Sequence, residues 1–409
     1  MRKPTRFRLA AMMFLQFFIW GGWFVTMGSY LASNLHANGA QSALAYSTQS
    51  WGAIIAPFIV GLIADRYFNA ERLLGALHIA GGILLYALFS ARSFRAFYPC
   101  LLGYMILYMP TLALVNTISF RQMDEPARHF ASVRVWGTIG WIVAGLVISY
   151  LFAWDSHAGM TQGALSNTFL MCSVASFALG IYSFTLPRTP PLPRPEEPAR
   201  LGRVLGLDAL VLLRHRNFVV FFVASILICI PLAFYYQNAN QFLTEIQVAN
   251  ATGKQTIGQM SEVLFMLLIP VFLRTFGMKT TLLIGMLAWA ARYVMFAFGN
   301  AHTLAFLLIT GIALHGVCYD FFFVSGQVYT DSKAGAQHKA AAQGLITLAT
   351  YGIGMLVGFW AAGLIDDLYA AGGAHDWKAI WLYPAAFAAL VFVLFAATFR
   401  NERVAYAGS

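Results

Sequence analysis

The sequence contains twelve long, nearly continuous apolar runs that are separated by short polar segments. A helix needs about 20 apolar residues to cross the hydrocarbon core of a bilayer, and each run has roughly that length. A transmembrane β-barrel would instead need alternating segments of about ten residues. We therefore expect an all-α integral membrane protein with twelve transmembrane helices. The runs lie at residues 9–31, 44–64, 72–91, 96–119, 133–153, 167–187, 217–242, 256–274, 280–299, 303–327, 341–365 and 378–399.

Charged residues are few and lie mainly between the runs. Only 10% of the residues are charged and 59% are hydrophobic, whereas soluble domains carry about 25% charged residues. With the N-terminus in the cytoplasm, twenty of the 26 lysines and arginines fall in cytoplasmic segments and four in outer loops. This asymmetry predicts that both termini are cytoplasmic. It also explains the net charge of +10 without a nucleic-acid partner, and the lipid bilayer is the expected surrounding.

The runs form two groups of six. The first group occupies residues 1–187 and the second 217–409, and the segment 188–216 between them is rich in proline and arginine. We interpret this segment as a cytoplasmic loop between two six-helix halves, an organisation typical of the major facilitator superfamily. After the second run, Asp65 and Arg66 resemble the loop signature of that superfamily, in which an acid and a base lock the inward gate. We expect Asp65 and Arg66 to have this gating role.

Nothing in the sequence indicates catalysis. It has no phosphate-binding GxxxxGK[ST] loop, no nucleophile and base in a known arrangement and no cluster with metal-ligand spacing. The four cysteines lie inside apolar runs without a CxxC pair, so we interpret them as packing residues. We expect neither enzyme activity nor a metal or cofactor, and ATP-driven pumping is disfavoured for the same reason.

Ionisable residues inside a membrane are costly, and they are therefore the first candidates for a functional site. In the fifth run, Arg134, Thr138 and Trp141 share one helix face because they are spaced i, i+4 and i+7. A fixed cation, a hydroxyl and an aromatic ring suit a polar ligand with a ring. The alternative is that Arg134 only extends to the inner membrane interface while Thr138 packs.

The eighth run carries Gln259 and Glu262 three residues apart, on one face of an otherwise apolar stretch. An amide beside a carboxylate can hold sugar hydroxyls or base edges, and a carboxyl group in low dielectric can carry a proton. A structural hydrogen bond between helices is the alternative.

The tenth run contains His315 and Tyr319 on one face and Asp320 about 100 degrees further round the helix. A buried acid needs a partner or a proton. Asp320 is therefore a candidate for proton coupling, or else it forms a structural ion pair with Arg292 of the ninth run. His78, in the third run, is expected to be a satisfied helix histidine.

The seventh run has a polar and aromatic cluster near its outer end, with Tyr236, Gln237 and Asn240 on one face. This face could gate the outer vestibule or contact the substrate.

Nearly end to end, the chain resembles the bacterial nucleoside:proton symporters, the nucleoside-permease branch of the major facilitator superfamily. The resemblance implies a substrate site lined by Arg134, Thr138, Gln259 and Glu262, with aromatic residues beside them. The matching stretches are 15–23, 108–119, 134–140, 205–209, 259–262 and 318–322.

Some site positions depart from the pattern of that family. Trp141 replaces a phenylalanine, and His315 replaces a tyrosine beside Tyr319. Ala233 and Tyr236 stand where the family has a glutamine and an asparagine that contact the nucleoside.

The resemblance implies a proton-coupled nucleoside importer of the bacterial inner membrane that works by alternating access. We expect it to function as a monomer, with nucleoside and protons as its partners. We expect Glu262 and Asp320 to be the proton-linked acids. A sugar or glycoside symporter on the same fold is the alternative transporter, and a membrane nutrient sensor without transport is the alternative from another class.

Overall fold

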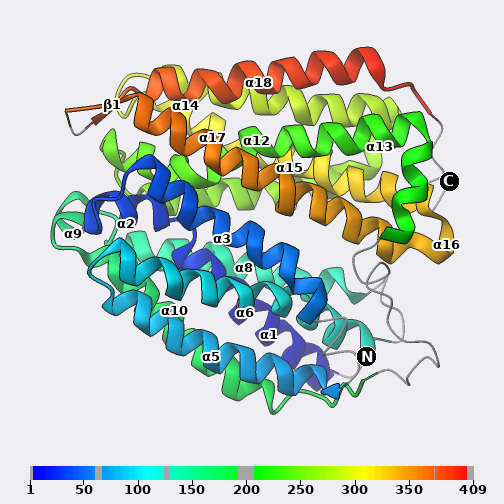
Figure 1. Ribbon diagram of the computed structural model, residues 1–409, viewed down its shortest axis with the longest axis horizontal. Coiled ribbons are helices and arrows are strands. Elements are labelled where there is room, and N and C mark those ends of the chain that lie inside the picture. Colours follow the sequence, from blue (N-terminus) through cyan, green and yellow to red (C-terminus); the bar gives the residue numbers. More distant parts are fainter. Residues whose placement is uncertain (1–2, 60–66, 124–128, 192–206, 373, 403–409) are drawn as a thin grey trace. The chain divides into compact units, whose positions relative to one another are not determined.

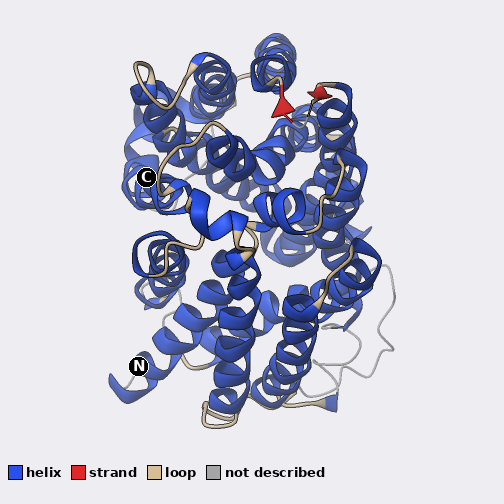
Figure 2. Cartoon of the chain, turned by 90° about the vertical axis from the view of Figure 1, so that its left-hand side faces the viewer, coloured by secondary structure: helices blue, strands red, loops and turns tan. Residues whose placement is uncertain are grey.

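The computed structural model describes the chain except for residues 1–2, 60–66, 124–128, 192–206, 373 and 403–409. Asp65 and Arg66 therefore lie outside the described residues. Nearly all of the described chain is helical (Figures 1 and 2). Within the described part, the strands are one antiparallel pair of two residues each, β1 (Ala370–Ala371) and β2 (Ala374–His375).

The chain divides into two compact units. One comprises Met1–Arg200 together with Ala249–Thr256, and the other comprises Leu201–Val248 together with Ile257–Ser409.

In the first unit, the long apolar runs became helices that pack on one another. Helix α1 lies against α8 and α10, helix α5 against α6 and α10, and α3 against α6. The elements are α1 (Lys3–Trp23), α2 (Met27–Asn34), α3 (Gly39–Phe58), α5 (Ala70–Ser90), α6 (Phe94–Arg121), α8 (Ala131–Leu146), the π-helical η2 (Val147–Leu151), α9 (His157–Thr161), the 3₁₀ helix η3 (Ala164–Ser166) and α10 (Asn167–Ser183).

The second unit is built in the same way, with α12 packed against α17 and α18 and with η4 against α16. Its elements are the 3₁₀ helix η4 (Leu207–Arg214), α12 (Arg216–Glu245), α13 (Ala251–Phe298), α14 (Ala305–Ala313), α15 (His315–Tyr319), the π-helical η5 (Asp320–Val324), α16 (Ser325–Thr347), the π-helical η6 (Leu348–Gly354), α17 (Met355–Leu368) and α18 (Trp377–Thr398).

The helix α13 contains two of the predicted spans. Its backbone leaves the helical conformation at Gly277, where φ is 76° and ψ is 173°. Glycine adopts a positive φ at no steric cost, so the chain can turn here between one membrane crossing and the next. The predicted spans at 256–274 and 280–299 lie on either side of this turn.

Ten helical stretches among the described residues are long and apolar enough to cross a membrane. One of them is α13 with its two spans, and α3 supplies the helix of the predicted span at 44–64. Each predicted apolar run therefore has a helical counterpart, and the expected all-α membrane fold is confirmed.

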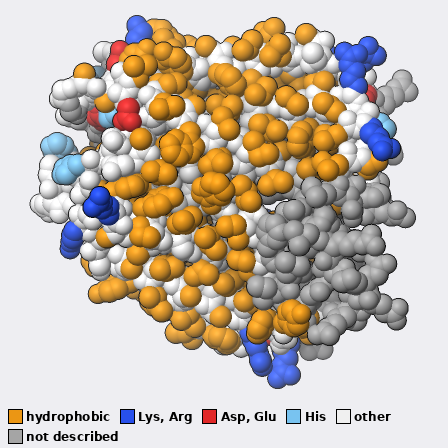
Figure 3. Space-filling view, viewed as in Figure 1, with side chains coloured by type: hydrophobic (Ala, Val, Ile, Leu, Met, Phe, Trp, Pro, Cys, Tyr) orange, Lys and Arg blue, Asp and Glu red, His pale blue; other side chains and the backbone are white. Residues whose placement is uncertain are grey.

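The outer surface is suited to lipid. Apolar side chains cover the middle of the visible face, and lysines, arginines and acids gather at its margins (Figure 3). Large side chains such as Leu151 and Leu267 are 69% and 73% exposed. Exposure of this kind is unfavourable in water and favourable in hydrocarbon.

Candidate functional site

In the first unit, Arg134 lies on α8 and faces α1. Its guanidinium carbon is 4.1 Å from the centre of the Phe17 ring, a geometry in which the negative face of the ring attracts the cation. The side chain is only half-buried. The geometry therefore holds the arginine against an aromatic face while part of its charge stays accessible to a ligand.

Aromatic side chains of α8, α1 and α6 pack together on the side of α8 that carries Arg134. Trp141 meets Trp20 of α1 edge to face at 5.6 Å between ring centres, and Trp20 meets Tyr108 of α6 at 5.8 Å. Trp141 and Thr138 are both half-buried. The face that the i, i+4, i+7 spacing predicted thus carries a cation, a hydroxyl and an indole, supported from behind by a packed aromatic cluster.

Behind this cluster, His78 ties four helices together. Its Nε2 lies 2.8 Å from Gln16 Oε1 and its Nδ1 lies 3.1 Å from Ser176 Oγ. Gln16 in turn donates to Thr111 Oγ1 at 2.7 Å. His78 is buried with both ring nitrogens engaged, so the prediction that it is a satisfied helix histidine is confirmed.

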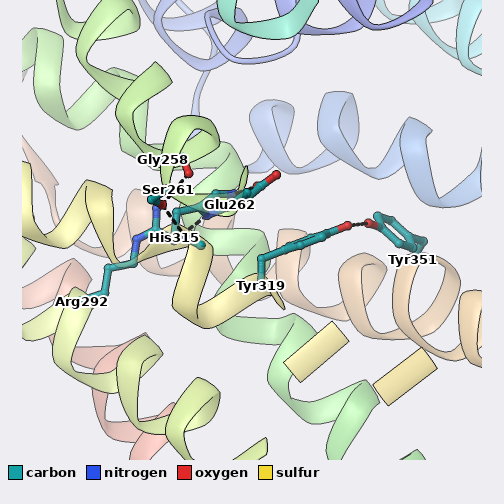
Figure 4. Close-up of polar contacts among 8 residues, drawn as sticks. Gly258, Ser261, Glu262, Arg292, His315, Tyr319 and Tyr351 are labelled. Carbon is teal, nitrogen blue, oxygen red and sulfur yellow. Dashed lines mark hydrogen bonds and ion pairs between the residues drawn. The ribbon is translucent and has the colours of Figure 1, made fainter. Parts of the chain in front are cut away.

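In the second unit, three ionisable side chains form a chain of contacts (Figure 4). His315 Nε2 lies 2.8 Å from Glu262 Oε1, and Arg292 Nη1 lies 3.0 Å from His315 Nδ1. Tyr235 of α12 covers the guanidinium, with its ring centre 3.4 Å from the guanidinium carbon, and it stacks on the histidine at 5.2 Å. Glu262 stays 19% exposed, whereas His315 is 2% exposed. The carboxylate is therefore accessible, and the groups behind it are not.

A close approach of α15 to α13 places His315 beside Glu262. A Cβ atom on Gly316 would lie 2.5 Å from the carbonyl carbon of Ser261 and 2.6 Å from the backbone nitrogen of Glu262, so this position has no room for a side chain. Ser261 Oγ accepts a hydrogen bond from the Gly316 N–H at 2.9 Å and donates one to Gly258 O at 2.7 Å. The two helices are thus fixed together at the residues next to the histidine and the glutamate.

Tyr319 and Tyr351 form a second polar group in this unit. Their hydroxyls are 2.8 Å apart, and both side chains are half-buried (Figure 4). Tyr319 directly precedes the π-helical stretch η5, and Tyr351 lies within η6. Short π-helical segments occur frequently at functional sites because the extra residue re-aims the side chains of that turn.

Asp320 is the first residue of η5 and is fully buried. No side chain within the described part of the chain donates a hydrogen bond to its two carboxylate oxygens, and the backbone at Met266 lies close enough to interact with them. The ion pair with Arg292 that was the structural alternative does not form, because Arg292 contacts His315 instead. A buried carboxyl group without a cation is the arrangement expected of a group that takes up a proton.

The residues expected on α12 do not share one environment. Tyr236 is half-buried and close enough to Glu262 and Tyr351 to interact with them electrostatically. Gln237 is buried and donates from Nε2 to Asp366 Oδ2 at 2.9 Å. Asn240 is also buried. On the substrate side of α12, the geometry therefore favours Tyr236 over Gln237.

The structure thus brings together Glu262, His315 and Tyr319, with Tyr236 close by, while Arg134, Thr138 and Trp141 form a polar face in the other unit. Gln259 is half-buried one helical turn before Glu262. A family model described as nucleoside H+ symporter matches residues 3–404. The chain belongs to the nucleoside H+ symporter family.

Relatives across this family are similar over nearly the whole chain. The Escherichia coli (strain K12) protein YegT, whose own assignment as a nucleoside transporter is provisional, is 41% identical over 97% of this chain and 94% of its own length. The xanthosine permease of the same organism is 35% identical over 95% of this chain and 94% of its own length. The family and these relatives are transporters, so this chain is a transport protein and not an enzyme.

A solved structure supports the same family and fold. The crystal structure of the nucleoside transporter NupG matches with a TM-score of 0.84 and 30% identity, covering 97% of this chain and 100% of NupG. The fold of this symporter is therefore that of the major facilitator superfamily.

Sequence reasoning missed three residues around the site. Tyr351 and Ser261 lie in apolar runs without a distinguishing pattern, and their roles depend on contacts with another helix. Asp366 follows the eleventh predicted run directly and accepts hydrogen bonds from Gln237 and Asn238. Because it stands at the end of that run, the spacing alone gives no sign of these contacts.

Proposed function

We propose that this member of the nucleoside H+ symporter family imports nucleosides together with protons across the bacterial inner membrane by alternating access. The observation that carries the proposal is the match of the nucleoside H+ symporter model to residues 3–404. The polar groups found inside the membrane support it, because they match the chemistry of a nucleoside. A carboxylate can accept hydrogen bonds from sugar hydroxyls, an arginine and an amide can read base edges, and aromatic rings can stack on the base.

Each unit, described by itself, offers polar groups that we propose as substrate contacts. Arg134 and Trp141 offer a cation and an indole from the first unit, while Glu262 offers a partly exposed carboxylate from the second. The full set of proposed substrate-binding residues is Arg134, Thr138, Trp141, Tyr236, Gln237, Asn240, Gln259, Glu262, His315 and Tyr319.

We assign proton coupling to the two acids inside the second unit, Glu262 and Asp320. The absence of a cation or a side-chain hydrogen-bonding partner for Asp320 among the described residues supports this role for that acid. Asp65 and Arg66 are proposed to lock the inner gate on the basis of their sequence pattern alone.

The proposed domain arrangement is a first half at 1–187, a cytoplasmic loop at 188–216 and a second half at 217–409, with both termini cytoplasmic. The support is the distribution of lysine and arginine between the apolar runs. We propose that the protein functions as a monomer, with nucleoside and protons as substrates in the lipid bilayer.

Uptake of labelled uridine into proteoliposomes tests the function. Accumulation that depends on an inwardly directed proton gradient is expected, and an excess of unlabelled nucleosides should compete whereas sugars should not. Gly344→Ala is a suitable control, because Gly344 is exposed and a Cβ atom there meets nothing within 4 Å. Competition by sugars alone would support the sugar or glycoside symporter. Binding of uridine without uptake would support the nutrient sensor.

A further inference from the structure

Arg292 is a buried cation that forms no direct ion pair with an acid among the described residues. Its side chain is 0% exposed. It donates to His315 Nδ1, and its face rests on the Tyr235 ring. A charged group in such surroundings is costly unless a charge of opposite sign compensates it. The hydrogen-bonded path from Arg292 to an acid leads through His315 to Glu262.

The contacts of His315 determine its protonation state. A guanidinium can only donate hydrogen bonds, so the Nδ1 atom facing Arg292 must carry a lone pair. Nε2 then carries the proton, and this N–H donates a hydrogen bond to the Glu262 carboxylate. A doubly protonated ring would set an N–H against the guanidinium N–H groups. His315 is therefore neutral and polarised, with its acceptor toward the cation and its donor toward the carboxylate.

The other ionisable groups near this path are neutral or weakly ionising. Tyr293 and Cys318 lie beside Arg292, and Tyr236 and Tyr319 lie near Glu262. The charge of a second acid, Asp320, interacts with that of Glu262. Two carboxylates cannot both be ionised at low cost in a poorly solvated site. Because Glu262 has a cation behind it and Asp320 has none, the negative charge belongs on Glu262.

We propose that Arg292 and His315 form a charge relay that holds Glu262 ionised and fixed in orientation as a hydrogen-bond acceptor for the nucleoside. This inference rests on the proposed function, and it gives different roles to the two acids Glu262 and Asp320. His315 and Arg292 are positioning residues that act through Glu262. His315, proposed above as a substrate-binding residue, then belongs to the site through Glu262, because neither of its ring nitrogens is left to contact a substrate. This replaces the shared coupling role proposed above: Glu262 stays ionised, and Asp320 alone carries the driving proton.

Glu262 Oε1 is occupied by His315, which directs the substrate to the other oxygen, Oε2. A permanently ionised carboxylate accepts hydrogen bonds and donates none. The favoured ligands are therefore nucleosides that offer a hydroxyl or N–H donor at this point.

Infrared spectroscopy of the purified full-length protein tests the relay without any ligand. The readout is the carbonyl-stretch band of a protonated carboxylic acid, with the Glu262→Gln spectrum subtracted so that only this residue contributes. Between about pH 8 and about pH 5.5, wild type should show no such band. Arg292→Gln and His315→Phe should gain it, because the carboxylate loses its cation or its connection to it.

A conservative variant separates the relay from a merely structural role. In His315→Gln, the side-chain oxygen can accept from Arg292 while the amide nitrogen donates to Glu262, so the band should stay absent. His78→Gln is the matched control, since His78 is an equally buried histidine of the other unit and should leave the Glu262 band unchanged. A Glu262-dependent band in wild type over this range would overturn the proposal, as would its absence from both Arg292→Gln and His315→Phe.

Uridine binding gives a second readout that also separates this inference from the proposed function. In an Asp320→Asn background, lowering the pH over the same range should weaken binding about tenfold in Arg292→Gln and leave it nearly constant in the parent. If wild type binds no nucleoside, the proposed function fails while the infrared result still decides the relay. If uridine binds but the pH dependence is the same with and without Arg292, the relay fails and the function stands.

Discussion

Adding a single methyl group at Gly316 should disturb the contact that places His315 beside Glu262. In Gly316→Ala, the new Cβ atom would lie 2.5 Å from the carbonyl carbon of Ser261 and 2.6 Å from the backbone nitrogen of Glu262. Carbon atoms in good contact are about 3.5–4.0 Å apart, so α13 and α15 must separate by roughly 1 Å. The obstacle is backbone, which cannot rotate away as a side chain could.

The magnitude follows from two opposing effects. Overpacking of a well-packed interior costs about 1–3 kcal/mol, and replacing a helical glycine by alanine gains about 0.5–1 kcal/mol. We expect a net loss of about 1–2 kcal/mol, which corresponds to an apparent Tm lower by about 2–8 °C for a unit of this size. Uridine affinity should also fall, because the 2.8 Å contact between His315 and Glu262 depends on this approach.

Thermal unfolding in detergent, with and without uridine, measures both effects. Gly344→Ala is the matched control, since its Cβ meets nothing within 4 Å, and the variant should gain about 0.5–1 kcal/mol from helix propensity alone. A Gly316→Ala protein that melts as high as Gly344→Ala and binds uridine normally would refute the close approach of the two helices.

Three further predictions address ligand binding, proton coupling and the loop that carries His375. Arg134→Ala should fold normally and lose the rise in Tm that uridine gives. In wild type this stabilisation is worth about 2.7 kcal/mol at a hundredfold excess of uridine over Kd. If Arg134→Ala keeps the wild-type rise in Tm, Arg134 is not in the site. Asp320→Asn should still exchange nucleoside across the membrane yet fail to concentrate it under an imposed pH gradient, and retained accumulation would remove its coupling role. Outside the membrane spans, the Glu245 carboxylate accepts a hydrogen bond from His375 and so raises the pKa of this histidine, whose Nδ1 lies 2.9 Å from Glu245 Oε2. This pair therefore stabilises the fold fully below about pH 6.5 and loses its effect as the pH rises through the higher pKa of His375 in the folded state. The Tm difference between wild type and Glu245→Gln should shrink when the pH is raised. A Tm difference that grew with pH would contradict the pairing.

The sequence alone determined the membrane architecture and most of the polar candidates. Hydrocarbon leaves a backbone no solvent partner, so a run of about twenty apolar residues has one stable solution, a spanning helix. Charged side chains are also costly to place in hydrocarbon and are therefore rare inside the runs. For this reason Arg134, Glu262 and Asp320 stood out individually. Helical periodicity also placed Thr138 and Trp141 on the face of Arg134, since the residues of one helix face follow from spacing alone.

Only the tertiary structure decided which of these residues touch. The sequence offered Arg292 and Asp320 as an ion pair, but the structure pairs Arg292 with His315 and leaves Asp320 without a cation among the described residues. Such pairings depend on the rotation and axial offset of one helix against another, which the local pattern of either helix does not contain. The π-helical turn at Asp320 and the contact between Tyr319 and Tyr351 have the same origin. Each is set by packing between helices. The role of Gly316 likewise becomes clear only from the neighbouring backbone of Ser261 and Glu262, for which this glycine leaves room.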